Sequence, residues 1–273
     1  MPVSNTDSLV LVERDGDIVT LTFNDPDHRN AMTREMGEAF SDRIAKLLPD
    51  TSIRAAIVTG AGRAFSAGGD MAMLGNLATQ GAENPGLSRR PIRDTMRSFY
   101  GLFLSLRDLP CPTLAAINGH AIGAGLCVAL ACDLRFVSTK AKLSLNFSKL
   151  GIHPGMAATW TLPRLVGPAL AAELLYTGRS LDAEEAARIG LVNRAVEPGQ
   201  LLEVTRGVAA EVATAGPIAT RGIKRSLARS ADASLESQLE FEAHEQALCF
   251  ESADIREGLA AARDKRPAEF EGQ

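Results

Sequence analysis

An apolar strand pattern, a glycine-rich turn and a helix follow one another twice in the chain, at residues 53–71 and 113–133. A turn of this kind presents backbone N–H groups at the start of a helix, where the helix dipole stabilises negative charge. The repeated pattern therefore predicts an α/β protein whose glycine turns bind a phosphate or stabilise an oxyanion.

The rest of the pattern divides the chain into a strand-containing part and a helical tail. A hairpin is predicted around Asp15-Gly16, where two short alternating runs meet. Beyond about residue 200 no strand-like run occurs. We therefore predict a core of residues 1–199 and a helical C-terminal region of residues 200–273, with helices near 201–213, 217–229, 234–252 and 254–264.

Local signals define several further elements. Thr33 is placed to cap a helix that Pro49 ends. Asp182, with Glu185 three residues later, is typical of an acidic capping box. The stretch 78–91 is rich in Gly, Pro, Asn and Ser, and this composition predicts a mobile segment.

Composition excludes several classes of protein. The formal net charge is −4, whereas nucleic-acid-binding surfaces are dominated by basic residues. The most apolar stretch, residues 121–132, is too short to cross a bilayer, which takes about 20 residues. The four cysteines have no C-x-x-C spacing, and we find no signal-peptide pattern before them. We therefore expect a cytoplasmic protein with reduced thiols and with no bound metal, nucleic-acid partner or membrane contact.

Familiar nucleotide-binding and nucleophile motifs do not fit the glycine turns. The first turn begins Gly60-Ala61-Gly62, but Phe65 stands where a dinucleotide-binding fingerprint has its third glycine. The sequence also has no G-x-S-x-G nucleophile elbow and no Walker phosphate-binding loop. A Rossmann-type site is therefore disfavoured.

Three segments around the turns form a more specific combination, namely residues 65–70, 115–125 and 129–133. Together they resemble the enoyl-CoA hydratase/isomerase (crotonase) family. The resemblance covers nearly the whole chain, because residues 25–32 are similar to that family's coenzyme A loop. Further similar positions are residues 174–178 and 190–192, Phe250, Arg256-Glu257-Gly258, Lys265-Arg266 and Phe270.

This resemblance implies a fold, an assembly and a chemistry. The fold is a crotonase-like α/β superhelix of repeated ββα units with a helical C-terminal region, which mediates homotrimers that often pair into hexamers. The chemistry is stabilisation of an acyl-CoA thioester enolate by an oxyanion hole, which maps onto the backbone N–H groups of Gly69 and Ala124. Coenzyme A enters as part of the substrate, and no permanently bound cofactor is implied.

The resemblance also implies a set of coenzyme A contacts. Arg29 and Lys265 would meet phosphates, although each is alternatively a solvated surface charge. Phe250 lies in a predicted helix and is alternatively part of the core or of a subunit interface. Asp70 is expected to fix its loop by backbone hydrogen bonds rather than to transfer protons. The implied contacts are Arg29, Ala31, Ala67, Asp70, Met71, Phe250 and Lys265.

The sequence departs from the family at its catalytic carboxylates. The two glutamates with which hydratases hold and activate water fall on Cys127 and Phe147. A further position, an aspartate in some dienoyl isomerases and aryl-CoA dehalogenases, falls on Gly155. A positioned acid or base contributes about 10²–10⁴-fold to a rate, so conventional hydration should be very slow.

The remaining candidates for proton transfer near the site are His153, Cys127 and Tyr100. His153 is the leading candidate, because histidine is the side chain best suited to proton transfer near neutral pH; the alternative is a histidine that hydrogen-bonds its own turn. Cys127 lies on an apolar helix, where a cysteine usually behaves as a small buried hydrophobe. Two hypotheses follow: an acyl-CoA hydratase, isomerase or lyase with an unconventional proton-transfer group, or a non-catalytic acyl-CoA-binding protein.

Overall fold

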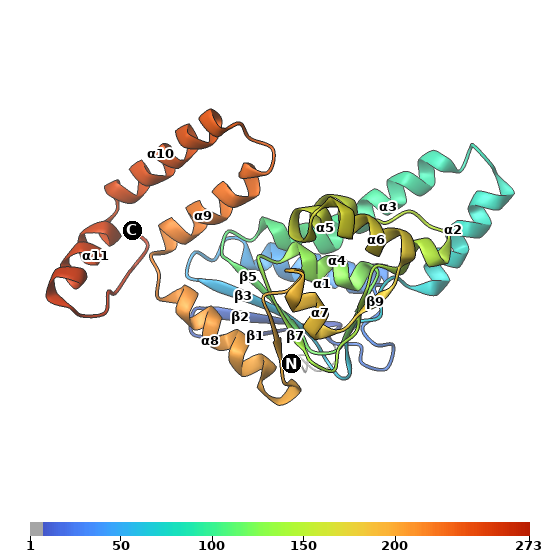
Figure 1. Ribbon diagram of the computed structural model, residues 1–273, viewed down its shortest axis with the longest axis horizontal. Coiled ribbons are helices and arrows are strands. Elements are labelled where there is room, and N and C mark those ends of the chain that lie inside the picture. Colours follow the sequence, from blue (N-terminus) through green and yellow to red (C-terminus); the bar gives the residue numbers. More distant parts are fainter. Residues whose placement is uncertain (1–7) are drawn as a thin grey trace, which may run out of the picture.

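The computed structural model describes residues 8–273, and its strands form two sheets (Figure 1). The larger sheet has six strands in the order β1-β2-β3-β5-β7-β10, and the smaller has four in the order β4-β6-β8-β9. The strands of the larger sheet are β1 (Val10–Asp15), β2 (Ile18–Phe23), β3 (Ala55–Gly60), β5 (Thr113–Ile117), β7 (Leu134–Ser138) and β10 (Arg194–Val196). Those of the smaller sheet are β4 (Ala64–Ser66), β6 (His120–Ile122), β8 (Leu143–Ser144) and β9 (Ser180–Leu181).

The larger sheet combines one hairpin with a row of parallel strands. β1 and β2 pair antiparallel around Gly16, whose φ is +60°, and this confirms the predicted hairpin. From β2 to β10 all neighbouring strands are parallel. Every residue of β3 and β5 is buried, as expected for parallel strands that are covered on both faces.

Alternation along β3 separates two apolar cores. Ala56 and Val58 face the larger core with helices α1, α3 and α4, whereas Ala55 and Ile57 face the smaller core with α8. In Figure 1, α8 accordingly lies on the opposite side of the sheet from α1 and α4. The helices are α1 (Arg34–Leu47), α2 (Met71–Glu83), α3 (Arg89–Leu104), α4 (Ala124–Ala131), α5 (Ala158–Val166), α6 (Pro168–Thr177), α7 (Ala183–Arg188), α8 (Leu201–Ala213), α9 (Pro217–Ser230), α10 (Leu235–Glu251) and α11 (Ala253–Asp264), with short 3-10 helices at Ser105–Asp108, Asn146–Leu150 and Pro198–Gln200.

The predicted helix caps are confirmed. The Thr33 side chain accepts a hydrogen bond from the Met36 N–H, and α1 ends two residues before Pro49. The Asp182 carboxylate accepts from the Glu185 N–H at 2.8 Å. The four helices predicted in the tail all form with bounds close to those expected, because their signals are local.

Most of the stretch 78–91, for which the sequence predicts mobility, is helical. Residues 78–83 complete α2 and residues 89–91 begin α3, so only 84–88 lie between helices. The Asp70 side chain caps α2 by accepting from the Met73 N–H at 2.6 Å. This cap and the Ala, Leu and Met residues of α2 outweigh its glycines, each of which costs about 1 kcal/mol in a helix.

The smaller sheet brings the two glycine turns together. The turns that sequence alone presented as loops each contain a short strand, β4 or β6, and these two strands pair in parallel. The segments that follow them therefore leave the sheet at the same edge. A Cβ on Gly68 would lie 2.5 Å from the Ile122 carbonyl oxygen, and one on Gly125 would lie 2.6 Å from the Ser66 Cβ. Only glycine permits this approach of the two backbones.

Helices α9, α10 and α11 extend away from the sheets, on the side opposite to α2 and the start of α3 (Figure 1). Lys224 of α9 connects them to the core: its Nζ donates to the Cys111 carbonyl oxygen at 2.8 Å and lies 3.0 Å from the Asp133 carboxylate. The helical C-terminal region expected from the sequence is therefore present. Within residues 8–273, no helix combines the length and the apolar character needed to cross a membrane.

Replacing Gly68 by alanine tests the contact between the turns. Gly68 has a φ of +93°, so Gly68→Ala combines backbone strain with a clash against a carbonyl oxygen. We expect the free energy of unfolding to fall by about 2 kcal/mol or more, measured by urea denaturation at fixed protein concentration. The control is Gly75→Ala in α2, where a Cβ meets nothing within 4 Å. That change should stabilise by about 0.5–1 kcal/mol, and equal effects of the two would contradict the argument.

Candidate active site

An apolar cavity of about 520 Å³ opens where the two glycine turns meet α2 and α3. Among the described residues that line it there is no carboxylate, lysine or arginine. Its polar side chains are those of Tyr100, Asn146 and His153. The apolar wall formed by α2 and α3 consists of Met71, Met73, Leu74, Leu77, Ala78, Ile92, Met96 and Phe99. The cavity therefore suits an uncharged, largely apolar group.

Gly69 and Ala124 contribute backbone to the same cavity, one from each glycine turn. In the described part of the chain, neither N–H has a hydrogen-bond acceptor. Ala124 is the first residue of α4, so its N–H lies at the positive end of the helix dipole. The turns are in contact here, since a Cβ on Gly68 would lie 3.7 Å from the Ala124 nitrogen. Two unused donors on one apolar wall can stabilise an oxygen atom that gains negative charge.

A second hollow, of about 510 Å³, carries positive charge. It is lined by the basic side chains of Arg29, Arg63 and Lys142 and by His120. Ala67 and Ile122 line both this hollow and the apolar cavity, so the two spaces adjoin. Sequence reasoning named Arg29 and Ala67 but missed Arg63, His120 and Lys142. Lys142 is the hardest to find, because only the pairing of β6 with β8 brings it beside His120.

Asn30 holds the segment 25–32 against the first glycine turn. Its side chain is buried and donates to the carbonyl oxygens of Ala61 at 3.0 Å and Ala64 at 2.8 Å, while its Oδ1 accepts from the Asp25 N–H at 2.9 Å. The Ala67 N–H donates to the Arg29 carbonyl at 2.9 Å. This places Arg29 at the mouth of the basic hollow. Asn30 is a positioning residue that the sequence did not reveal.

The other expected coenzyme A contacts divide into two groups. Asp70 uses its carboxylate to cap α2, in line with the loop-fixing role preferred from the sequence, and Met71 lies 65% exposed on the cavity wall. Ala31 is half-buried beside Asn30 but lines neither space. Phe250 lies on α10 and is 68% exposed, and Lys265 lies just beyond α11. Neither residue lines the cavity or the basic hollow.

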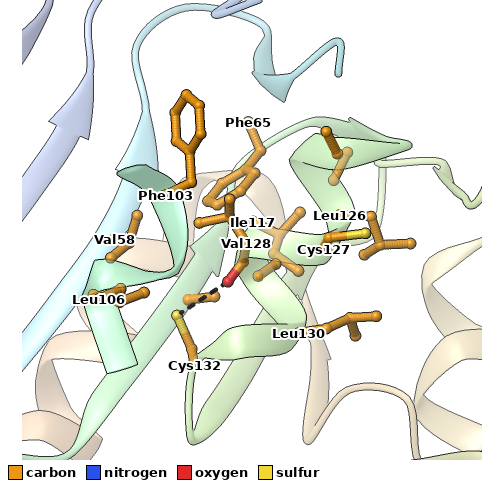
Figure 2. Packing of buried hydrophobic residues seen from close by; sticks show 14 of the residues in the cluster. Val58, Phe65, Phe103, Leu106, Ile117, Leu126, Cys127, Val128, Leu130 and Cys132 are labelled. Carbon is orange, nitrogen blue, oxygen red and sulfur yellow. Dashed lines mark hydrogen bonds between the residues drawn. The ribbon is translucent and has the colours of Figure 1, made fainter. Parts of the chain in front are cut away.

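Cys127 and Phe147, at the positions of the expected glutamates, bring no carboxylate to the site. Cys127 is fully buried in α4, and Figure 2 shows it among the hydrophobic side chains of the core. Its thiol lies 3.8 Å from the Gly155 carbonyl oxygen, and burial raises its pKa to about 12. Cys127 is therefore a small buried hydrophobe, as its place on an apolar helix predicted. Phe147 lines the cavity, its ring 3.8 Å from where a Gly123 Cβ would stand.

His153 lies at the cavity with one ring nitrogen already engaged. Its Nδ1 is 2.7 Å from the Pro154 carbonyl oxygen. Because a carbonyl oxygen only accepts hydrogen bonds, Nδ1 carries the hydrogen and is the donor. In the neutral ring the Nε2 atom then has a free lone pair, which is the form that accepts a proton. The bond to its own turn therefore exists, and it leaves His153 able to act as a base.

Comparison with known proteins relates this geometry to a family. The family model described as enoyl-CoA hydratase/isomerase matches residues 13–273. The chain belongs to this family. Both the resemblance expected from the sequence and the crotonase-like fold are confirmed.

Relatives in the enoyl-CoA hydratase/isomerase family have different activities. Crotonyl-CoA hydratase of Syntrophomonas wolfei is 32% identical, covering 96% of this chain and 97% of its own. The 1,2-epoxyphenylacetyl-CoA isomerase of Escherichia coli is 34% identical, covering 94% of this chain and 95% of its own. Among solved structures, enoyl-CoA hydratase from Bacillus anthracis has a TM-score of 0.86 at 31% identity, covering 97% of this chain and 100% of its own.

Alkylation tests the protonation state of the Cys127 thiol. Because burial favours the protonated form and raises the pKa to about 12, almost no thiolate exists at pH 8, and a thiolate is what reacts. We expect iodoacetamide to leave Cys127 unmodified in the native protein and to modify it after unfolding in urea. Peptide mass spectrometry measures both. Rapid modification of native Cys127 would contradict its assignment as an inert core residue.

Proposed function

We propose that this protein is an enzyme that acts on acyl-CoA thioesters and stabilises their enolates. The observation that carries the proposal is that the Gly69 and Ala124 N–H groups, each without an acceptor in residues 8–273, line one apolar cavity. In this proposal the two N–H groups form the oxyanion hole and donate hydrogen bonds to the thioester oxygen.

The chemistry follows from the charge that develops on this oxygen. When a proton leaves the carbon next to the thioester, the electron pair moves onto the carbonyl oxygen and gives an enolate. Two fixed N–H donors and the start of α4 stabilise that charge without having to reorient. The apolar wall, including Phe147, excludes water and so strengthens both interactions.

Proton transfer falls to a group other than a carboxylate. Cys127 stays protonated and Phe147 has no ionisable group, so the two positions that activate water in hydratases cannot do so here. We propose His153 as the acid/base, with Nδ1 fixed by Pro154 and Nε2 exchanging the substrate proton. Isomerase or lyase chemistry of an enolate is therefore favoured over conventional hydration.

Coenzyme A would occupy the basic hollow as part of the substrate. A thioester of coenzyme A is apolar at its acyl end and anionic at its phosphate end. The apolar cavity adjoins a hollow lined by Arg29, Arg63 and Lys142, which supports binding of such a molecule across both. Ala67, which lines both spaces, would lie between the two ends, Met71 would line the acyl end, and Ala31 and Asp70 would contact coenzyme A from the adjoining loops.

The helical C-terminal region is proposed as the assembly element of a homotrimer or a dimer of trimers. In one chain Phe250 and Lys265 lie away from both spaces, so they would contact coenzyme A only across a subunit interface. Helices α9 to α11 expose large apolar side chains, which favours their burial against other copies: Ile223, Leu227, Leu235, Leu239, Leu248, Phe250 and Leu259. The division into residues 1–199 and 200–273 and a cytoplasmic location belong to the same proposal.

The second candidate function is a non-catalytic acyl-CoA-binding protein. It is favoured by the absence of any carboxylate among the described cavity residues. The two functions differ at the carbon next to the thioester, because only an enolate-forming site exchanges its protons. Hexanoyl-CoA that binds but acquires no deuterium in D₂O would favour the binding protein.

A matched pair at Gly69 tests the oxyanion hole. Gly69→Pro removes the N–H, whereas Gly69→Ala keeps it and adds a Cβ in ordinary contact, 3.7 Å from Leu74. Since this N–H has no acceptor in the described chain, its removal breaks no hydrogen bond of the fold. We expect the proline variant to exchange the α-protons of hexanoyl-CoA about 10²–10³-fold more slowly in D₂O by mass spectrometry. The alanine variant should stay near the wild-type rate.

Circular dichroism of both Gly69 variants controls for folding. Deuterium exchange at the wild-type rate by a folded Gly69→Pro protein would refute the oxyanion assignment.

The same exchange assay in D₂O tests His153. Undiminished exchange by His153→Ala would remove the histidine from the mechanism.

A further inference from the structure

Tyr100 places a hydroxyl group without a partner on the wall of the apolar cavity. The side chain comes from α3, is half-buried and lines the cavity. Within residues 8–273 no group makes a hydrogen bond with its hydroxyl. A phenol that lines an apolar cavity and makes no hydrogen bond within the described chain is free to donate its O–H to a ligand bound there.

Gly155 is the residue that makes room for this hydroxyl. A Cβ at position 155 would lie 2.4 Å from the Tyr100 Oη and 2.7 Å from its Cζ. Gly155 does not have a positive φ, so its backbone alone does not require glycine. The phenol is what excludes a side chain at this position. The Gly155 carbonyl oxygen in turn lies 3.8 Å from the Cys127 thiol. The hydroxyl therefore lies beside Gly155 and Cys127, two positions at which the sequence lacks a carboxylate that other family members have.

The Tyr100 hydroxyl is a donor and not a base. Burial raises its pKa, and the neighbouring Cys127 raises it further. The phenol is therefore neutral at physiological pH and presents an O–H to the cavity. An uncharged oxygen is the acceptor that fits, because a carboxylate would enter a space whose described lining offers no lysine or arginine side chain.

We propose that Tyr100, whose hydroxyl occupies the space that Gly155 leaves open, is a specificity-determining residue that donates a hydrogen bond to an uncharged oxygen on the acyl group of the thioester. This inference rests on the proposed function, because it assumes that an acyl-CoA occupies the cavity. The favoured substrates are thioesters whose acyl chain carries a hydroxyl or carbonyl oxygen.

The cavity contains other polar groups that a test must separate from Tyr100. His153 already donates from Nδ1 to Pro154. Asn146 lines the cavity, and a Cβ on Gly123 would lie 3.4 Å from its Oδ1. The Asn146 amide can both donate and accept, whereas Tyr100 is distinguished by a substitution that removes one oxygen and nothing else.

The experiment compares hexanoyl-CoA with 3-hydroxyhexanoyl-CoA and 5-hydroxyhexanoyl-CoA by isothermal titration calorimetry. For wild type we expect at least one hydroxylated thioester to bind more tightly than hexanoyl-CoA. Tyr100→Phe should weaken that thioester about tenfold, the effect of one hydrogen bond, and leave hexanoyl-CoA nearly unchanged. The matched control is Tyr176→Phe, because Tyr176 is 82% exposed and lies outside both spaces.

Gly155→Ala provides a second test that does not alter Tyr100 itself. The added methyl must displace the phenol, so it should abolish the preference for the hydroxylated thioester in wild type. In Tyr100→Phe the preference should already be lost. Adding Gly155→Ala to that variant should therefore leave the ratio of the two affinities unchanged. A purely structural role of Tyr100 would instead weaken all three thioesters in parallel.

Each other result has a defined meaning. A hydroxyl preference that survives Tyr100→Phe would overturn the proposal and point to Asn146. Equal binding of all three thioesters by wild type would overturn it as well, while leaving the proposed function intact. Failure of every thioester to bind would overturn the proposed function and this inference together.

Discussion

The site depends on the close approach of two backbone segments. Gly68 faces the Ile122 carbonyl oxygen and Gly125 faces Ser66, both at separations that exclude a Cβ. The parallel pairing of β4 with β6 sets the relative positions of these segments, since the chain leaves both strands at the same edge. Without this contact the donors of the two turns would belong to separate loops. The glycines therefore act through geometry, by allowing two N–H groups to share one cavity.

That shared cavity collects hydrogen-bond donors that the described fold does not use, and their positions are informative. Two N–H groups and a phenol hydroxyl lack partners in the described chain, although most groups of this kind in folded proteins are satisfied. A ligand that expels water from the cavity leaves each of these donors at a cost of about 1–3 kcal/mol unless it supplies an acceptor. A ligand that offers oxygen atoms to these donors recovers the lost interactions, which is why their positions indicate function.

Local signals could be predicted from the sequence, and contacts between distant segments could not. The caps at Thr33 and Asp182 and the helices of the tail follow from neighbouring residues, and all of them form. The helical character of residues 78–83 was missed because glycine content was weighed without the cap supplied by Asp70. The basic hollow was missed in part because Lys142 reaches His120 only through strand pairing. The family resemblance did place Gly69 and Ala124 together, which periodicity alone could not.

The substitutions at the catalytic positions of the family are physically consistent with one another. A buried carboxylate at 127 or 147 would require charge compensation, and the described lining of the cavity contains no lysine or arginine. A cysteine that stays protonated, a phenylalanine, and a glycine that accommodates a neutral phenol all avoid that requirement. Under the proposed function, the cavity thereby lacks the groups that would activate water and keeps the donors that would stabilise an oxyanion. In such a site the enolate oxygen would be the only atom that needs to carry full negative charge, and selectivity among acyl groups would depend on a single neutral hydroxyl.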